Sequence, residues 1–215
     1  MKMTHREFLV WLSGLGSLGL LGGLVKHKML PSPALEPEKP FELPQFAARV
    51  KHVVNGVLFG IDRARKIVTA HAEADGRLLW ESHGESKFII PGAAFPIDLS
   101  PEGELWVANV GRKHLEQLDL KTGKFIASWR PLEEFGGCCN PVRFAALSGG
   151  RFVTMEKGMR RACIYQPSGT LEQVVTEELS DSEFNYFLVR HEGKIHLYDT
   201  GAKKHWEVLQ HDDQT

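Results

Sequence analysis

The chain has 215 residues, 42% of them hydrophobic, and its 26 basic and 27 acidic residues give a formal net charge of −1. This length suits one domain with a substantial core plus an appendage, and the balanced charge excludes a general attraction to nucleic acid. The three cysteines exclude a disulfide scaffold, and the sequence contains no zinc-ribbon cysteine pairs, phosphate-binding glycine loop or nucleophile elbow.

Residues 1–30 have the pattern of an export signal. A basic start over residues 1–6 precedes an apolar, glycine-rich run over residues 8–25. Residues 4–9 also resemble a twin-arginine export motif in which His5 replaces the first arginine. Because about 20 apolar residues span a bilayer, we expect an N-terminal apolar helix that contacts the inner membrane through residues 8–25 and anchors a periplasmic or otherwise extracytoplasmic domain. A cleaved signal peptide is the alternative.

The next residues predict a spacer. Five prolines fall between residues 31 and 45, among glutamate, lysine and serine. Such a stretch favours extended polyproline conformations and behaves as a semi-rigid linker, which would hold the rest of the chain away from a membrane. Residues 46–215 form the predicted folded domain.

The clearest pattern in this domain runs from Phe135 to Val175. Four runs of strand length, at residues 142–147, 152–154, 162–165 and 171–175, are separated by turn residues. Consecutive short strands joined by tight turns predict a four-stranded antiparallel meander, which is one blade of a β-propeller.

Three further units recur at a period of about 45 residues, which is typical of propeller blades. Pro96-Ile97-Asp98-Leu99 aligns with Pro141-Val142-Arg143-Phe144 and argues against a β-sandwich, the alternative all-β fold. We predict an all-β propeller of about four four-stranded blades and favour a compact ring; paired half-rings or further divergent blades are alternatives. The expected strands are residues 56–62, 66–71, 77–82 and 88–90 in the first unit, 95–99, 105–109, 114–120 and 125–129 in the second, and 184–190, 194–199 and 205–209 in the fourth. Residues 46–54 are predicted to supply the missing strand of the fourth unit, since an unpaired sheet edge favours aggregation.

The third unit resembles the NHL-type propeller repeats of exported bacterial proteins. The resemblance rests on Gly137-Cys138-Cys139-Asn140-Pro141, on Val153-Thr154-Met155-Glu156-Lys157 and on Ser168-Gly169. It covers about one blade, and residues 161–165 depart from the more basic strand of the pattern. The resemblance implies an NHL-like propeller, a fold with many functions, and so implies no particular reaction.

Propeller loops open alternately on two faces, and this predicts a binding face. The loop before the first strand of a blade and the loop between its second and third strands share one face, on which we expect a protein or peptide partner to bind. We expect residues 72–75 of the first unit on this face, and residues 148–150 and 167–169 on the opposite one. The candidate contact residues are Cys138, Cys139, Asn140, Glu156, Lys157, Arg160 and Asn109.

Several of these residues have more than one interpretation. Cys138 and Cys139 are small buried turn residues, a vicinal disulfide, or a thiolate that binds a metal or pairs with Cys163, and nearby basic residues would lower a thiol pKa. Glu156 and Lys157 are an acid–base pair, a ligand clamp or a structural ion pair. We interpret Cys163 as a buried strand residue. The tryptophans Trp80, Trp106 and Trp129 are interpreted as packing residues rather than a ligand cage.

The sequence favours binding over catalysis. We assign no catalytic residue and expect no cofactor. One alternative is a propeller hydrolase or lactonase dependent on calcium or another metal, because Asp98, Asn109, Asn140 and Glu156 offer the oxygen ligands that calcium prefers. A second alternative is a thiol redox role for Cys138 and Cys139.

Overall fold

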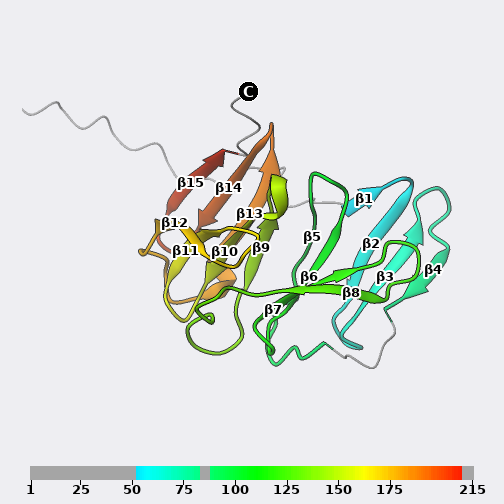
Figure 1. The fold of residues 1–215 in the computed structure, drawn as a ribbon, viewed down its shortest axis with the longest axis horizontal. Helices are drawn as coiled ribbons and strands as arrows, with labels where there is room; N and C mark the ends of the chain where they lie inside the picture. Colours follow the sequence, from blue (N-terminus) through cyan, green and yellow to red (C-terminus); the bar gives the residue numbers. More distant parts are fainter. Residues whose placement is uncertain (1–51, 83–87, 210–215) are drawn as a thin grey trace, which may run out of the picture. The chain divides into compact units, whose positions relative to one another are not determined.

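The computed structural model describes residues 52–82 and 88–209. In these ranges fifteen strands form four antiparallel sheets, three with four strands and one with three (Figure 1). Within each sheet, strands that are adjacent in sequence are hydrogen-bonded neighbours, so each sheet is a propeller blade. The predicted all-β propeller with four blades is therefore confirmed.

The strands follow the predicted runs closely. Blade 1 consists of β1 (His52–Val54), β2 (Val57–Asp62), β3 (Ile67–Ala72) and β4 (Leu78–Glu81). Blade 2 consists of β5 (Ile97–Leu99), β6 (Leu105–Asn109), β7 (His114–Leu118) and β8 (Phe125–Trp129). Blade 3 consists of β9 (Arg143–Ala146), β10 (Phe152–Glu156), β11 (Arg161–Tyr165) and β12 (Leu171–Thr176). Blade 4 consists of β13 (Tyr186–His191), β14 (Lys194–Asp199) and β15 (Lys204–Leu209), and two short 3₁₀ turns are η2 (Ser148–Gly150) and η3 (Glu183–Asn185).

The predicted N-terminal features lie outside the described residues. These are the anchor helix within residues 1–30 and the spacer at residues 31–45. Within residues 52–82 and 88–209, no helix is long and apolar enough to cross a membrane.

Blade 3 shows how alternation along a strand builds a propeller core. Every residue of β10 is buried. Successive side chains of a strand point to opposite faces. Phe152 joins a cluster with residues of blades 1 and 2, whereas Val153 and Met155 join a cluster with residues of blade 4. The turn before β10 places Gly150 at φ +71°, a conformation that glycine adopts without steric cost.

Tryptophans on the outer strands connect successive blades. Trp80 on β4 donates from Nε1 to the carbonyl oxygen of Leu120 at 2.8 Å, and Trp129 on β8 donates to that of Pro167 at 3.1 Å. Both acceptors lie in the turn between the third and fourth strands of the next blade, so the contact repeats. Trp106 is buried and packs edge-on against Phe152. The packing role predicted for these tryptophans is confirmed.

The first strand of the domain differs from the prediction. Residues 52–54, predicted to complete the fourth blade, pair instead with β2 in the register His52↔Phe59. Asn55 and Gly56, both at positive φ, form the tight turn between the two strands. A local hairpin of this kind loses less chain entropy than a pairing with the far end of the domain. Blade 4 has three strands in the described part of the chain.

The outer edge of blade 1 also differs. Because β1 is the first strand, the run at residues 78–81 is the fourth, and residues 88–90 form no strand. Residues 88–90 instead connect blade 1 to blade 2: the N–H of Ile89 donates to Oδ1 of Asn109 at 2.8 Å, and the N–H of Gly111 donates to the carbonyl oxygen of Ile89.

The turn at residues 72–75 consequently opens on the opposite face from the one predicted. It lies between the third and fourth strands of blade 1, and the N–H of Glu73 donates to the carbonyl oxygen of Gly56 in the β1–β2 turn. The loop of blade 1 that shares the predicted binding face is therefore residues 63–66, between β2 and β3.

Candidate functional site

The two loops predicted to form the binding face of blade 3 do lie together. The N–H of Lys157 donates to Oδ1 of Asn140 at 3.1 Å, and a Cβ atom on Gly137 would lie 3.2 Å from the Cα of Gly158. On the opposite face, a Cβ on Gly150 would lie 3.5 Å from the ring of Pro167. The predicted sharing of faces within blade 3 is confirmed.

Three of the candidate contact residues are fully buried, so their side chains brace the fold and do not reach a partner. Asn109 accepts from the Ile89 N–H and donates to Glu116, and Asn140 donates to the carbonyl oxygen of Gly136. Glu156 accepts hydrogen bonds from Thr154 Oγ1 at 3.0 Å, Tyr165 OH at 2.7 Å and Arg161 Nε at 2.9 Å.

Glu156 and Lys157 are not paired with each other. Lys157 forms an ion pair with Glu183 in η3, which precedes the first strand of blade 4. Glu156 is held within blade 3 by Arg161. Glu156 is the last residue of β10 and Lys157 begins the turn that follows, and the two side chains bind different partners. Of the three interpretations only the structural one agrees with the geometry, with a different partner for each residue. Arg160 is exposed at this surface and donates from Nε to the carbonyl oxygen of Leu179 at 2.7 Å.

The cysteines separate into exposed and buried thiols. All three are free, with Cys138 exposed, Cys139 half-buried at φ +61°, and Cys163 buried in β11 as predicted. Burial, together with the neighbouring Cys138, raises the pKa of Cys139 against the opposing charge of Lys157, so the predicted lowering is wrong for Cys139. Burial and the nearby Glu156 raise the pKa of Cys163 to about 12.

The four oxygen donors proposed for calcium have separate surroundings. Asp98 is bound to groups on β9 and β13, whereas Asn109 is bound to Ile89 and Glu116. Asn140 and Glu156 are held by partners of their own, as described above. No hydrogen-bond partner is shared among the four side chains in the described part of the chain.

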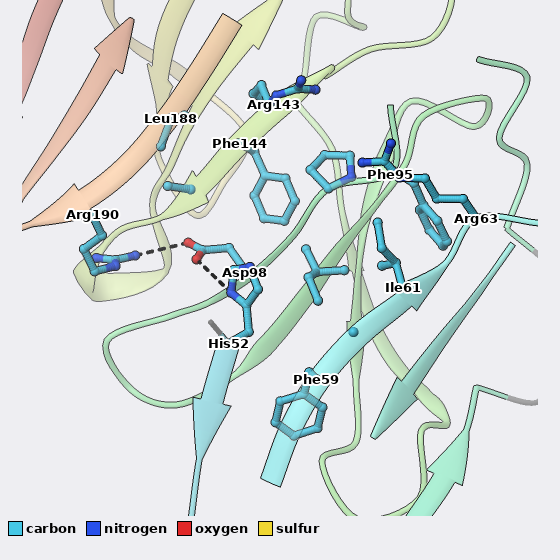
Figure 2. A pocket seen from close by; sticks show the side chains of 14 residues that line it. His52, Phe59, Ile61, Arg63, Phe95, Asp98, Arg143, Phe144, Leu188 and Arg190 are labelled. Carbon is cyan, nitrogen blue, oxygen red and sulfur yellow. Dashed lines mark hydrogen bonds and ion pairs between the residues drawn. The ribbon is translucent and has the colours of Figure 1, made fainter. Parts of the chain in front are cut away.

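A pocket of about 460 Å³ lies between the inner strands and has walls from all four blades (Figure 2). Its volume is in the range of small-ligand sites, and its wall combines apolar and aromatic side chains with charged ones. In Figure 2, the apolar side chains of Phe144 and Ile61 lie between the Asp98–Arg190 pair and Arg63. The lining residues are His52, Phe59, Gly60, Ile61, Arg63, Phe95, Pro96, Ile97, Asp98, Arg143, Phe144, Ala145, Leu188 and Arg190.

Asp98 joins the inner strands of all four blades at one side of the pocket. Its Oδ2 accepts from the N–H of Ala146 on β9 at 2.9 Å and from Nη2 of Arg190 on β13 at 3.1 Å, and its Oδ1 lies 3.8 Å from Nδ1 of His52 on β1. Burial raises the pKa of Asp98, although Arg190 and the Ala146 N–H act in the opposite direction. Burial lowers the pKa of His52 more than Asp98 raises it, so the imidazole is neutral at pH 7.

Three arginines, Arg63, Arg143 and Arg190, line the pocket, whereas Asp98 is the one carboxylate among the described lining residues. Arg190 also donates from Nη2 to the carbonyl oxygen of Ala146 at 2.6 Å, while its Nη1 is buried without a hydrogen-bond partner among the described residues. Arg143 donates to the carbonyl oxygens of Val142 and Tyr186. Burial and the charge of Arg63 lower the pKa of Arg143, so these two cations repel each other. The pocket therefore combines apolar walls with an excess of positive charge.

The sequence pattern did not predict this pocket. The recurrence of a charged residue at the inner strand, Asp98 in blade 2 and Arg143 in blade 3, is the signal that could have indicated it. Arg63 lies in a loop and Arg190 and His52 come from distant parts of the chain, so their convergence depends on how the blades pack.

Comparison with curated proteins finds a relative of the NHL-repeat type. No protein-family model matches the chain. The chain is 28% identical over 141 residues to NHL repeat-containing protein 3 of Mus musculus; the match covers 60% of this chain and 39% of the relative. The chain thus corresponds to well under half of that relative's length.

Solved structures with some similarity are likewise longer than this chain. BamB from Moraxella catarrhalis aligns with a TM-score of 0.41 at 12% identity, over 76% of this chain and 48% of that one. Hydrazine synthase of Kuenenia stuttgartiensis aligns with a TM-score of 0.43 at 11% identity, over 72% and 46% of the two chains. Virginiamycin B lyase from Staphylococcus aureus aligns with a TM-score of 0.45 at 13% identity, over 74% and 54%. This chain is therefore a β-propeller of four antiparallel blades with sequence similarity to an NHL repeat-containing protein.

Proposed function

We propose that this propeller is an exported binding module whose pocket receives an anionic group of a protein or peptide partner. The observation that carries the proposal is the meeting of Arg63, Arg143 and Arg190 around an apolar-walled pocket. Arginine is the residue best suited to carboxylates, because its planar guanidinium can form two parallel hydrogen bonds.

Two features of the arginines favour an anion over a neutral ligand. The mutual repulsion of Arg63 and Arg143 would be relieved by a negative charge between them. Arg190 also has a donor to spare: its Nη1 is buried without a hydrogen-bond partner among the described residues, which costs about 1–3 kcal/mol, and a side-chain rotation that brought it into the pocket would let a ligand oxygen satisfy it. The apolar wall, which includes Phe144 and Leu188, suits the aliphatic or aromatic part of a peptide terminus or acidic side chain.

The pocket adjoins the binding face expected from the sequence. Arg143 follows the Cys138–Asn140 loop by only a few residues, and Arg63 lies in the β2–β3 loop, which opens on the same face. We place the anionic group of the partner in the pocket, and the exposed Cys138 and Arg160 with the half-buried Lys157 at the edge of the interface. The buried side chains of Glu156, Asn140 and Asn109 hold the loops of this face in position through their hydrogen bonds.

We further propose that the domain is exported and held at the inner membrane by residues 8–25, with residues 31–45 as the spacer. The basic and then apolar order of residues 1–30 supports this. Replacing residues 8–25 with a polar sequence should abolish membrane association in cell fractionation and leave the thermal unfolding of the domain unchanged. Recovery of the unaltered protein in the cytoplasm with an intact N-terminus would contradict the proposal.

Binding can be tested with peptides that differ in one charge. The probe is a random hexapeptide library with free C-terminal carboxylates, selected on the purified full-length protein, and individual peptides are then measured by fluorescence anisotropy. We expect selected peptides to carry a carboxylate that is essential for binding, with affinity falling as salt increases. Amidation or Asp/Glu-to-amide replacement should weaken binding at least about tenfold, the effect of 1.4 kcal/mol.

Matched variants locate the site. Arg63→Met and Arg143→Met should each lose at least about tenfold in affinity, since each removes a charge-assisted contact. Arg77→Met, at an exposed position between β3 and β4, serves as the control and should bind as the unaltered protein does. Equal affinity for the acid and amidated peptides, or unchanged affinity in both pocket variants, would refute the proposal.

A further inference from the structure

Outside the pocket, blade 4 carries a second cluster of chemically active side chains. Nitrogen atoms of His196 on β14 and His205 on β15 and a carboxylate oxygen of Glu207 on β15 all lie within 4.8 Å of one another. None of these residues lines the pocket, and none was singled out by the sequence analysis as a ligand.

Strand register explains why these side chains meet. His196 is directly opposite Glu207, and Tyr198 is directly opposite His205, so all four side chains lie on one face of the blade. The alternate residues of the same strands point into the core shared with blade 3; they are Ile195, Leu197 and Val208. The cluster is thus fixed by a regular pair of strands and not by a loop.

The distances match those between ligands of a small metal ion. Nδ1 of His196 lies 3.1 Å from Nε2 of His205 and 3.8 Å from Oε1 of Glu207. Bonds of about 2.0–2.1 Å in a tetrahedral zinc site place neighbouring ligand atoms roughly 3.3–3.4 Å apart. At 3.1 Å one imidazole N–H donates to the other ring, and a metal ion would take the place of that proton.

Surrounding side chains orient the three donors. The ring of Tyr198 is stacked on that of His205 with the centroids 4.4 Å apart. Lys194 donates from Nζ to Oε2 of Glu207 at 2.7 Å, which leaves Oε1 facing the histidines. Outer contacts of this kind hold metal ligands in position.

We propose that His196, His205 and Glu207 bind a divalent transition metal, of which zinc fits the donor set best. Two imidazoles and one carboxylate are a set that zinc accepts, and three protein ligands leave a fourth position for water or for a group from a partner. Calcium prefers six to eight oxygen ligands and does not fit this cluster. This site is independent of the proposed anion pocket.

Zinc titration of the full-length protein tests the proposal. Protein purified without a histidine tag and stripped with chelator is titrated with zinc sulfate by calorimetry, with thermal unfolding measured in parallel. We expect one equivalent to bind with a raised Tm, because an ion that binds only the folded state stabilises it. Calcium chloride should produce neither effect.

Variants distinguish this site from incidental binding. His205→Gln and Glu207→Gln alter exposed residues, so they should fold normally by circular dichroism and weaken zinc binding at least about tenfold. His114→Gln is the control, because His114 also lies beside a carboxylate, 3.9 Å from Glu116, but is not part of this cluster. Absence of stoichiometric zinc binding, or binding that both cluster variants retain, would overturn the proposal.

Discussion

Removing the carboxylate of Glu156 should destabilise the propeller strongly, although its neighbour Lys157 is dispensable. Glu156→Ala leaves Thr154, Tyr165 and Arg161 without the acceptor that they share in the interior. Breaking a buried ion pair from one side costs about 3–5 kcal/mol, which for a domain of this size lowers Tm by roughly 6–20 °C. Lys157→Ala removes a partly exposed pair with Glu183 and should change the free energy of unfolding by no more than about 1 kcal/mol.

The assay is urea unfolding followed by tryptophan fluorescence, with calorimetry for Tm. A double-mutant cycle with Arg161→Met identifies the cause. If the cost arises from the unpaired charge of Arg161, the Glu156→Ala/Arg161→Met protein should be more stable than the sum of the single changes predicts, by about 0.5–3 kcal/mol. A Glu156→Ala protein within about 1 kcal/mol of the unaltered one would refute the structural role and return Glu156 to the candidate contact residues.

Three further predictions follow from the same structure. Gly150→Val should lower the free energy of unfolding in urea by about 1–3 kcal/mol, because valine is strained at φ +71°. A Cβ at this position would make only an ordinary contact, so a clash would not explain the loss, and an unchanged unfolding midpoint would contradict the strain argument. Cys163, buried and with its pKa raised to about 12, should resist iodoacetamide in the native protein at pH 8 and react after unfolding, as measured by peptide mass spectrometry. The folded-state pKa of His52 lies below its ordinary value of 6.5, so the folded state binds fewer protons and stability should fall as pH drops below 6.5. His52→Gln should reduce that slope, and an unaltered slope would exclude His52 as a source.

The strands of blade 3 illustrate what local sequence specifies well. Turn residues such as Gly150 and Gly169, which take positive φ, separate short apolar runs, and each strand pairs with its neighbour in the chain. The wrong prediction for the first strand of blade 1 also concerns a local turn signal. The short run at residues 52–54 is followed by the Asn55-Gly56 turn, a strong local hairpin signal that outweighs a pairing with the distant blade 4.

The local sequence pattern predicted much less of the candidate site than of the strands. The position of Glu156 in a loop-facing motif indicated the correct face, but its burial follows from Arg161 and Tyr165 on the next strand. The proposed zinc ligands are His196, His205 and Glu207, which lie on two strands. They meet only because of the register in which β14 pairs with β15.

The sequence by itself determined the blade repeat, the strand order within blades 2 to 4 and the face shared by the Cys138 and Lys157 loops, because a meander is built from contacts between chain neighbours. The tertiary structure alone decided which polar side chains converge. Arg63, Asp98 and Arg190 come from three different blades, and the pocket that they line exists only where the inner strands pack together. Convergence of this kind depends on blade packing and burial, which no spacing within one blade encodes.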